Sequence, residues 1–266
     1  MRLIVTDLDG TLLDRSTYAW EEARAALDLL RLHDVPLVFC TSKTRAETES
    51  WRRLLDNRHP FIVENGGAVL IPRGYFPFPV EASAHDAQCD VLALGPPYPE
   101  LTGALRRASA SSGCRVRGFA DMSAAEVARE CQMPIEQAEL ARQREYDEPF
   151  LILDADRTAD LLAAIDRQGM RHTRGGRFYH ILGNNDKAEA VRLLVGLYRR
   201  TGEDVETIGL GDGLNDASFL NAVDIPILIR SPLLEQLQAA VPRGVPTERV
   251  GPQGWHDAIL RHWGGA

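Results

Sequence analysis

The chain has 266 residues, enough for one large domain and a smaller second one. A formal charge of −8 at pH 7 argues against a nucleic-acid-binding protein, and no apolar run is long enough to cross a membrane. The N-terminus enters a predicted strand without a signal-peptide pattern, and the four cysteines form no C-x-x-C pair. We therefore expect a cytoplasmic protein with reduced thiols.

The first predicted strand ends at two carboxylates. An apolar run over residues 3–5 is typical of a buried strand, and Asp7-Leu8-Asp9-Gly10-Thr11 follows it. Ligands bind at the carboxyl ends of strands in open α/β sheets, where two buried acids need a cation such as Mg²⁺. Asp7 can then attack phosphorus, while Asp9 protonates the leaving oxygen and later activates water. The alternative interpretation is an Asp-rich turn after a strand.

Helices and strands alternate along the next part of the chain. We expect helices over about 20–33 and 44–56 and strands over 36–40 and 61–63, as in a parallel sheet with crossover helices. The second strand leads into Thr41-Ser42-Lys43-Thr44, whose hydroxyls and backbone N–H groups can hold a phosphate. Thr44 and Glu47 also fit a capping box, which is a structural role.

Three prolines and a glycine between residues 72 and 79 interrupt this alternation. Beyond them the sequence predicts a different segment, with four helices, a strand near 150–153 and a hairpin over 171–182 around Gly175-Gly176. The alternation resumes at Asp186. We therefore predict an α/β protein whose Rossmann-like, parallel-sheet core, residues 1–79 and 184–266, carries an inserted α+β cap domain at residues 80–183. The four helices are expected over 101–110, after the capping box at 123–126, over 134–144 and over 158–168.

Two further stretches add charged residues to the predicted site. Asp186-Lys187 opens a helical pattern, and a lysine there would balance the charges of an aspartate, a metal and a phosphate. Taken alone, a lysine at the start of a helix is usually a solvated side chain. Later, an apolar run over 207–210 leads to Asp212. Asp212 is the expected third metal ligand. Asn215 and Asp216 would orient metal-bound water or hold the loop, unless Asn215 only caps a helix.

The four stretches around Asp7, Thr41, Lys187 and Asp212, in this order along the chain, resemble the motifs of the haloacid dehalogenase superfamily of phosphohydrolases. The resemblance implies that Asp7 is the nucleophile, Asp9 the general acid and base, and Thr41 the phosphate-binding hydroxyl. It also implies that Lys187 balances charge and that Asp212 binds the metal. The backbone carbonyl of Asp9 would be a further Mg²⁺ ligand, and the reaction would pass through an aspartyl-phosphate intermediate.

Several short sequence segments are similar to segments of the mannosyl-3-phosphoglycerate phosphatase family within that superfamily. They are Cys40–Arg45, Ile62–Gly67, Arg144–Phe150 and Gly175–His180. Because the last two lie in the predicted cap, the resemblance runs nearly end to end. Membership would imply that phosphate is removed from mannosyl-3-phosphoglycerate to leave mannosylglycerate, in a compatible-solute pathway. Glucosyl-3-phosphoglycerate or another sugar phosphate is the alternative substrate.

A substrate of this kind carries a phosphate, a carboxylate and a hexose, so we looked for charged and amide side chains. Arginines are expected to pair with the carboxylate or phosphate, and a Glu-Asn pair with sugar hydroxyls. The candidate substrate-binding residues are Lys43, Glu64, Asn65, Arg144, Arg177 and His180. Arg174 is a weaker candidate; cap arginines are often solvated, and His180 can simply complete the hairpin. The pair His172 and His180 lacks a third ligand nearby, which argues against a transition-metal site.

The main hypothesis is a Mg²⁺-dependent phosphomonoesterase acting on a small-molecule sugar phosphate. Sucrose phosphatases and phosphomannomutases would share the same core chemistry. From a different class, the chain could be a phosphosugar-binding regulator with an inactive site, but the intact set Asp7, Asp9, Lys187 and Asp212 argues against this. The choice between mannosyl and glucosyl substrates and the oligomeric state are left open.

Overall fold

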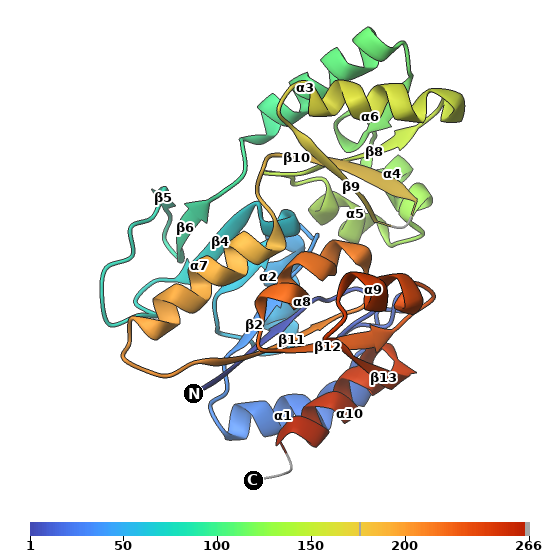
Figure 1. Ribbon diagram of the computed structural model, residues 1–266. Coiled ribbons are helices and arrows are strands. Elements are labelled where there is room, and N and C mark those ends of the chain that lie inside the picture. The colour runs from blue at the N-terminus through green and yellow to red at the C-terminus, as the bar shows by residue number, and fades with distance from the viewer. Residues whose placement is uncertain (176, 264–266) are drawn as a thin grey trace.

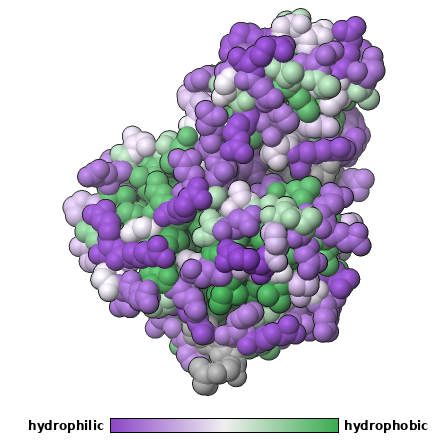
Figure 2. Space-filling view, in the orientation of Figure 1, coloured by the Kyte–Doolittle hydropathy of each residue, from purple (hydrophilic) through white to green (hydrophobic). Residues whose placement is uncertain are grey.

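The computed structural model describes residues 1–175 and 177–263 and forms two parts, one above the other in Figure 1. The larger part, which we call the core, contains both ends of the chain, and the smaller part, the cap, is built from the middle. The prediction of an α/β core with an inserted second domain agrees with this architecture. On the face shown in Figure 2 the cap is mostly hydrophilic, and hydrophobic residues gather mainly on the core. Among the described helices, none is long and apolar enough to span a membrane.

A nine-stranded sheet runs through the core in the order β13-β12-β11-β1-β2-β3-β4-β6-β5. The strands from β13 to β3 are parallel, and β4, β6 and β5 extend the edge in antiparallel pairs. The strands are β1 Arg2–Thr6, β2 Leu37–Cys40, β3 Phe61–Val63, β4 Ala68–Pro72, β5 Ala84–His85, β6 Cys89–Ala93, β11 Glu206–Gly211, β12 Ile225–Arg230 and β13 Val245–Val250.

Helices cover both faces of this sheet. In β1, Ile4 packs on the face covered by α1 and α10, whereas Leu3 and Val5 pack on the face covered by α7, α8 and α9. This burial on both faces explains why the parallel strands read as continuous apolar runs rather than as alternating patterns. The core helices are α1 Arg24–Leu32, α2 Arg45–Leu54, α7 Lys187–Arg199, α8 Ala217–Ala222, α9 Leu234–Ala240 and α10 Gly251–Trp263.

The cap is a four-stranded antiparallel sheet in the order β7-β8-β10-β9. Helices α3 and α6 share one apolar cluster with Phe150 of β8, and α4 and α5 form another with Phe178 of β10. The predicted hairpin of β9 and β10 is present, although Gly176 in its expected turn lies outside the described residues. The elements are α3 Tyr98–Ser112, β7 Val116–Gly118, α4 Ala124–Cys131, α5 Ile135–Ala141, β8 Glu148–Ile152, α6 Thr158–Asp166, β9 Arg171–Gly175 and β10 Phe178–Leu182.

The strands β5 and β6 bear on where the core ends. The sequence analysis places the start of the cap at residue 80, but β6 pairs with β4 along residues 68–72 and β5 pairs with β6. Both strands therefore extend the core sheet. We propose that the cap begins after Ala93 and that the chain returns to the core between Leu182 and Lys187.

Candidate active site

Four predicted site residues meet at one edge of the core sheet. Asp7 follows β1, Thr41 follows β2, Asp212 follows β11, and Lys187 is the first residue of α7. Because β1 pairs in parallel with both β2 and β11, the three strands end at the same edge. Neighbouring strands thus bring together side chains that lie up to 205 positions apart, from Asp7 to Asp212.

Lys187 is the cation at the centre of this edge. Its Nζ donates to Asp7 Oδ1 at 2.8 Å, to Asp216 Oδ1 at 2.6 Å and to the carbonyl of Cys40 at 2.9 Å. Only 1% of the side chain is exposed. Burial alone would lower the pKa of Lys187, but Asp216 and Asp7 raise it above its usual value, so this buried ammonium keeps its charge.

Three carboxylates surround a small space beside Lys187. Carboxylate oxygens of Asp7, Asp212 and Asp216 lie within 4.8 Å of one another. Burial, together with the charges of Asp216 and Asp212, raises the pKa of Asp7 to about 8 even though Lys187 opposes it. Burial likewise raises the pKa of Asp212 to about 6. The cluster therefore has an excess of negative charge and only oxygen ligands, and both features suit a hard divalent cation.

Backbone amides and neighbouring side chains hold two of these carboxylates in place. Asp216 Oδ2 accepts from the N–H groups of Asp212 at 3.1 Å and Gly213 at 3.0 Å, so Asp216 holds the loop as well as pairing with Lys187. Asp212 accepts from Thr11 Oγ1 at 3.2 Å. Such bonds fix the direction of each carboxylate, as bonds from surrounding groups do for carboxylates that ligate metals.

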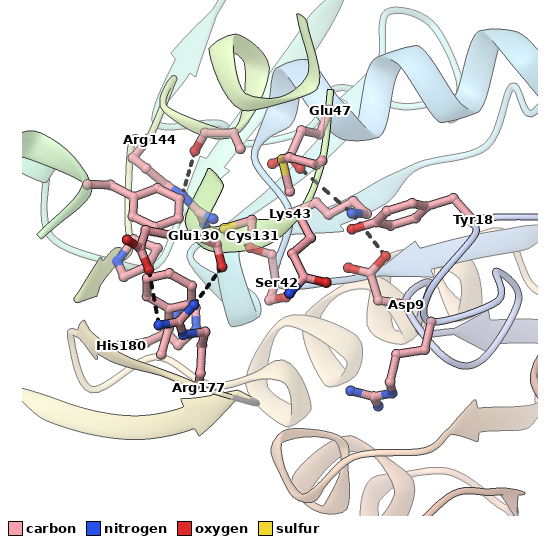
Figure 3. Close-up of a pocket in the computed structure, with 17 residues that line it drawn as sticks. Asp9, Tyr18, Ser42, Lys43, Glu47, Glu130, Cys131, Arg144, Arg177 and His180 are labelled. Atoms are coloured by element: carbon pink, nitrogen blue, oxygen red, sulfur yellow. Dashed lines mark hydrogen bonds and ion pairs between the residues drawn. The ribbon is translucent and has the colours of Figure 1, made fainter. Parts of the chain in front are cut away.

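Asp9 lies outside this carboxylate cluster. Its Oδ1 is 2.9 Å from Lys43 Nζ, which is also 3.7 Å from Glu47 Oε1 (Figure 3). Burial would lower the pKa of Lys43, but Asp9 and Glu47 raise it above its usual value. Lys43 is thus a buried cation between Asp9 and Glu47, and the Asp9 side chain is 33% exposed.

The loop after β2 positions the predicted phosphate hydroxyl. Thr41 is fully buried, and its Oγ1 accepts from the Lys43 N–H at 3.1 Å. The capping box predicted for Thr44 and Glu47 is present at the start of α2. Thr44 also donates to the carbonyl of Leu140 in the cap at 3.0 Å, so this loop serves both the site and the docking of the cap.

Two residues that the sequence analysis missed come from the loop after the first motif. Arg15 forms an ion pair with Asp212, and Tyr18 lies beneath Lys43, with the ammonium 4.8 Å from its ring centroid. Neither belongs to a recognisable motif. Residue type gave a signal only for the lysines, because Lys43 and Lys187 are the only two lysines among the 30 Lys and Arg residues. Both lysines lie in this site, which Arg15 joins as a third cation.

Two adjoining pockets lie at this edge. One, of about 180 Å³, is lined by Asp7, Asp212 and Asn215 and reaches Arg174 in the cap; we call it the phosphate pocket. The other, of about 350 Å³, lies between core and cap and is shown in Figure 3; we call it the leaving-group pocket. Both pockets are lined by Asp9, Arg15, Ser42 and His180.

The cap arginines differ in their surroundings. Arg177 lines the leaving-group pocket and pairs with Glu130 Oε2 at 3.0 Å, a partner that the sequence analysis missed. Arg144 lines the same pocket and donates to the carbonyl of Ser42 at 2.8 Å, so it also joins cap to core. Arg174 lines the phosphate pocket, with its guanidinium 5.2 Å from the Tyr179 ring centroid.

Glu64 and Asn65 contact the cap directly. The Glu64 carboxylate accepts from the N–H groups of Glu145 at 3.0 Å and Tyr146 at 2.8 Å, and Asn65 Nδ2 donates to Asp147 Oδ2 at 2.7 Å. Burial raises the pKa of Glu64 to about 8. These groups therefore dock the cap, and their predicted contact with sugar hydroxyls stays a prediction.

Asn215 and the glycines after Asn65 belong to the same contact. Asn215 Nδ2 donates to Asn65 Oδ1 at 3.4 Å, so it links the Asp212 loop to the docking contact. A Cβ on Gly66 would stand 2.3 Å from the Asp186 carbonyl oxygen, and one on Gly67 would stand 2.3 Å from Tyr146 Cβ. Only glycine permits these approaches.

The arrangement suits transfer of a phosphoryl group. A buried carboxylate sits beside an ammonium, a cluster that suits a divalent cation, and a strand-end hydroxyl, and a second carboxylate lies where the two pockets join. These are the parts needed for attack on phosphorus and for proton transfer to a leaving oxygen. Asp7, Asp9 and Asp212 line one pocket, Lys187 bonds Asp7, and Thr41 follows the neighbouring strand β2; their catalytic roles stay predictions.

Comparison with known proteins agrees with this chemistry. Residues 4–76 match the model of the haloacid dehalogenase-like hydrolase family. The chain is 42% identical to the glucosyl-3-phosphoglycerate/mannosyl-3-phosphoglycerate phosphatase of Methanococcoides burtonii, over 97% of this chain and 96% of the relative. It is 38% identical to the mannosyl-3-phosphoglycerate phosphatase of Pyrococcus furiosus, over 86% and 91%. Its fold is similar to that of a haloacid dehalogenase subclass IIB sugar phosphatase, BT4131, with a TM-score of 0.67, 17% identity and 99% of each chain covered.

Proposed function

Because this chain belongs to the mannosyl-3-phosphoglycerate phosphatase family of haloacid dehalogenase-like hydrolases, we propose that it hydrolyses mannosyl-3-phosphoglycerate to mannosylglycerate and phosphate. The observation that carries this proposal is the pair of adjoining pockets. The phosphate pocket holds the candidate nucleophile Asp7, and the leaving-group pocket holds cations and hydrogen-bonding groups from both core and cap. A simple phosphoester would fill only the first pocket.

The charges of the leaving-group pocket support an anionic, glycosylated leaving group. Arg15, Lys43, Arg144 and Arg177 line it together with three carboxylates, Asp9, Glu47 and Glu130. Arginine and lysine pair with a carboxylate, and glutamates accept hydrogen bonds from sugar hydroxyls. A glycosylglycerate presents one carboxylate and several hydroxyls, so its groups match this lining.

The proposed reaction takes two steps. In the first, an Asp7 carboxylate oxygen bonds to phosphorus, the bond from phosphorus to the substrate oxygen breaks, and Asp9 gives that oxygen its proton. In the second, the Asp9 carboxylate takes a proton from water whose oxygen bonds to phosphorus, and the bond to Asp7 breaks. Phosphate leaves and both aspartates return to their starting state.

Lys187, Lys43 and Thr41 support these steps. Lys187 bonds Asp7 and would balance the charge of the bound phosphate. Lys43 holds Asp9 at the place where the two pockets join, so that the Asp9 carboxyl group would face the leaving oxygen. The Thr41 hydroxyl and the amides of its loop would donate to phosphate oxygens.

We further propose that Mg²⁺ is the cofactor, held by Asp7, Asp212 and the backbone carbonyl of Asp9, with Asp216 beside it. The raised pKa of Asp7, caused by burial and the neighbouring acids, supports a cation at this place. When bound, Mg²⁺ neutralises negative charge on the phosphoryl oxygens and lowers the pKa of its carboxylate ligands.

Glucosyl-3-phosphoglycerate is the second candidate substrate, because the relative from Methanococcoides burtonii carries both names. Mannose and glucose differ only in the direction of one hydroxyl. The two sugars have the same size and the same number of hydroxyls, so a pocket of about 350 Å³ that admits one also has room for the other. We therefore propose that both sugars are accepted.

The test is a turnover assay with Mg²⁺ on a panel of phosphoesters: mannosyl- and glucosyl-3-phosphoglycerate, mannose 6-phosphate, sucrose phosphate and p-nitrophenyl phosphate. We expect the glycosyl-3-phosphoglycerates to give the highest kcat/KM. Preference for a simple hexose phosphate would overturn the substrate but keep the phosphatase. No turnover of any ester, with binding retained, would favour a phosphosugar-binding regulator.

A further inference from the structure

His180 occupies an unusual place, since it lines both pockets. It comes from β10 of the cap, and its side chain is 10% exposed. Its Nδ1 is 2.8 Å from Asp147 Oδ1 and 3.1 Å from Oδ2, so that nitrogen points away from the pockets into the protein. The opposite edge of the ring, with Nε2, is what remains to meet a substrate.

Asp147 is a fully buried carboxylate between cap and core. Besides His180 it accepts from Asn65 Nδ2 of the core at 2.7 Å. Asn65 in turn accepts from Asn215 Nδ2 at 3.4 Å. A chain of four polar side chains therefore runs from the Asp212 loop to the cap histidine, and Asp147 joins the two parts.

The backbone conformation at Asn65 supports a specific contact between Asn65 and Asp147. Asn65 and Glu64 both have positive φ, at 56° and 48°. Asparagine tolerates this left-handed region better than most residues, whereas glutamate is rarely found there. The turn places the Asn65 amide beneath Asp147, and the docked cap supplies the bonds that offset the strain.

The buried charge of Asp147 has a consequence for His180. Although burial would raise the pKa of Asp147, the partner His180, Arg144 and the bond from Asn65 hold it below its usual value. The Asp147 carboxylate contacts Nδ1 and so holds the ring with Nε2 toward the pockets; in the doubly protonated ring that Nε2–H is a donor.

We propose that Asp147 is a positioning residue that holds His180 so that its Nε2–H binds the carboxylate of the leaving group. This inference rests on the proposed function. In a glycosyl-3-phosphoglycerate one carbon separates the carbon bearing the phosphate from the carboxylate. With the phosphate beside Asp7, the carboxylate must therefore lie close to where the two pockets join, and that is where His180 lies.

Other charged groups share these pockets with His180, and most are engaged within the protein. Arg15 pairs with Asp212, Lys43 with Asp9 and Glu47, and Arg177 with Glu130. Arg144 bonds the backbone of Ser42, and Arg174 lies on the neighbouring strand β9. His180 differs in that its acidic partner binds the edge of the ring remote from the pockets.

Because Asp147 also bonds Asn65, docking of the cap on the core adds a second contact to the carboxylate that holds His180. The substrate carboxylate would then favour the docked state. Recognition of the leaving group and closure of the site over the phosphate would thus occur together.

The test compares Asp147→Asn and His180→Gln with the wild type, at equal Mg²⁺. For Asp147→Asn we expect KM for mannosyl-3-phosphoglycerate to rise about tenfold or more, with a smaller change in kcat, because a charge-assisted bond is weakened. Hydrolysis of p-nitrophenyl phosphate, which has no carboxylate, should change much less. Asn65→Gly, which keeps a backbone that tolerates positive φ, should shift KM in the same direction by less.

The pH dependence supplies a readout that a structural role would not move. In the wild type, kcat/KM for the carboxylate substrate should fall as pH rises through the His180 pKa. Without the Asp147 charge that pKa drops, so the fall should move to lower pH in Asp147→Asn and disappear in His180→Gln. An NMR titration of His180 in the free protein should show the same downward shift without any substrate.

Three outcomes would overturn the inference. They are an equal loss on both esters, an unchanged pH profile in Asp147→Asn, and an unchanged His180 titration. Thermal unfolding of each variant identifies a misfolded protein. If Asp147→Asn is misfolded, the NMR titration of His180 in Asn65→Gly and the pH profile of His180→Gln decide. If the wild type itself does not hydrolyse glycosyl-3-phosphoglycerates, the proposed function fails, and with it the assignment of the substrate carboxylate as the ligand of His180. The NMR titration still tests the Asp147–His180 pair in that case.

Discussion

Replacing Lys187 with Met removes the buried ammonium while keeping much of the side-chain volume. In the wild type Nζ donates at 2.8 Å to Asp7 and at 2.6 Å to Asp216, and the side chain is 1% exposed. Removing one partner of a buried ion pair costs about 3–5 kcal/mol, because the charge left behind is neither paired nor solvated. We expect a loss of this size in the free energy of unfolding of metal-free protein at about pH 9, above the Asp7 pKa of about 8.

The loss of stability caused by Lys187→Met should become smaller as the pH falls. Burial raises the pKa of Asp7 from 3.8 to about 8, so the native state binds a proton that the unfolded state has already released. The free energy of unfolding therefore decreases as pH rises through this window. Lys187 opposes the decrease, and without it the pKa of Asp7 rises further. At about pH 5 Asp7 is neutral in both proteins, and the variant should lose much less.

Urea unfolding in EDTA at three pH values measures this difference. Arg192→Met, on an exposed position of the same helix, is the matched control and should stay within about 0.5 kcal/mol of the wild type. In assays with Mg²⁺, Lys187→Met should lower kcat/KM about a thousandfold for every ester, since the lysine serves the phosphate. A similar stability loss at low and high pH would refute the reasoning, as would a kinetic loss confined to one ester.

The remaining predictions concern the nucleophile, the metal, the cap and the lysines. Asp7→Asn should abolish turnover of all esters and keep the fold; Asp9→Asn should be milder on p-nitrophenyl phosphate, whose leaving oxygen needs little protonation, and residual activity of Asp7→Asn would exclude the covalent route. EDTA should stop turnover and Mg²⁺ restore it, with beryllium fluoride inhibiting only when Mg²⁺ is present; full activity in EDTA would contradict the metal assignment. Arg177→Ala should lower kcat/KM for mannosyl-3-phosphoglycerate by about 1–3 kcal/mol, or about ten- to a hundredfold, and affect p-nitrophenyl phosphate much less, whereas equal losses would mean that Arg177 serves folding or closure. In ¹⁵N-lysine-labelled protein, the NMR signals of Lys43 and Lys187 should show that both lysines are still protonated at pH 10.5, the usual lysine pKa, because their acidic partners raise the pKa of each. Deprotonation of either lysine at that pH would contradict its buried ion pairs.

The core site was predictable because its parts depend on short-range rules. Each catalytic residue lies beside an apolar run or opens a helical pattern, and parallel strands end at one edge of a sheet. The positions of Asp7, Thr41, Lys187 and Asp212 follow from these two facts. The bond that Lys187 donates to Asp216 depends on how the start of α7 meets the Asp212 loop, and the sequence indicated only that Asp216 would orient metal-bound water or hold the loop.

The contacts between core and cap could not be read in the same way. Glu64 was expected to face the substrate, but its carboxylate binds backbone amides of residues 145 and 146, which become neighbours only when the cap docks. The bond between Asn65 and Asp147 escaped notice for the same reason, whereas Arg177 and Glu130 both lie in the cap and are brought together by its own fold. At the sheet edge, β5 and β6 are short strands after a proline-rich stretch, so local composition indicated a domain boundary where the chain in fact continues the sheet.

The account's central claim is that Asp7 takes the phosphoryl group from a glycosyl-3-phosphoglycerate. The most direct measurement is an acid quench of the wild type during turnover of mannosyl-3-phosphoglycerate labelled in its phosphate, followed by tryptic mapping. Cleavage after Arg2 and Arg15 releases a peptide that contains both Asp7 and Asp9. We predict that the label appears on this peptide at Asp7 and is absent from Asp7→Asn. Mannosylglycerate formed without any labelled protein, or a label on another peptide, would contradict the claim.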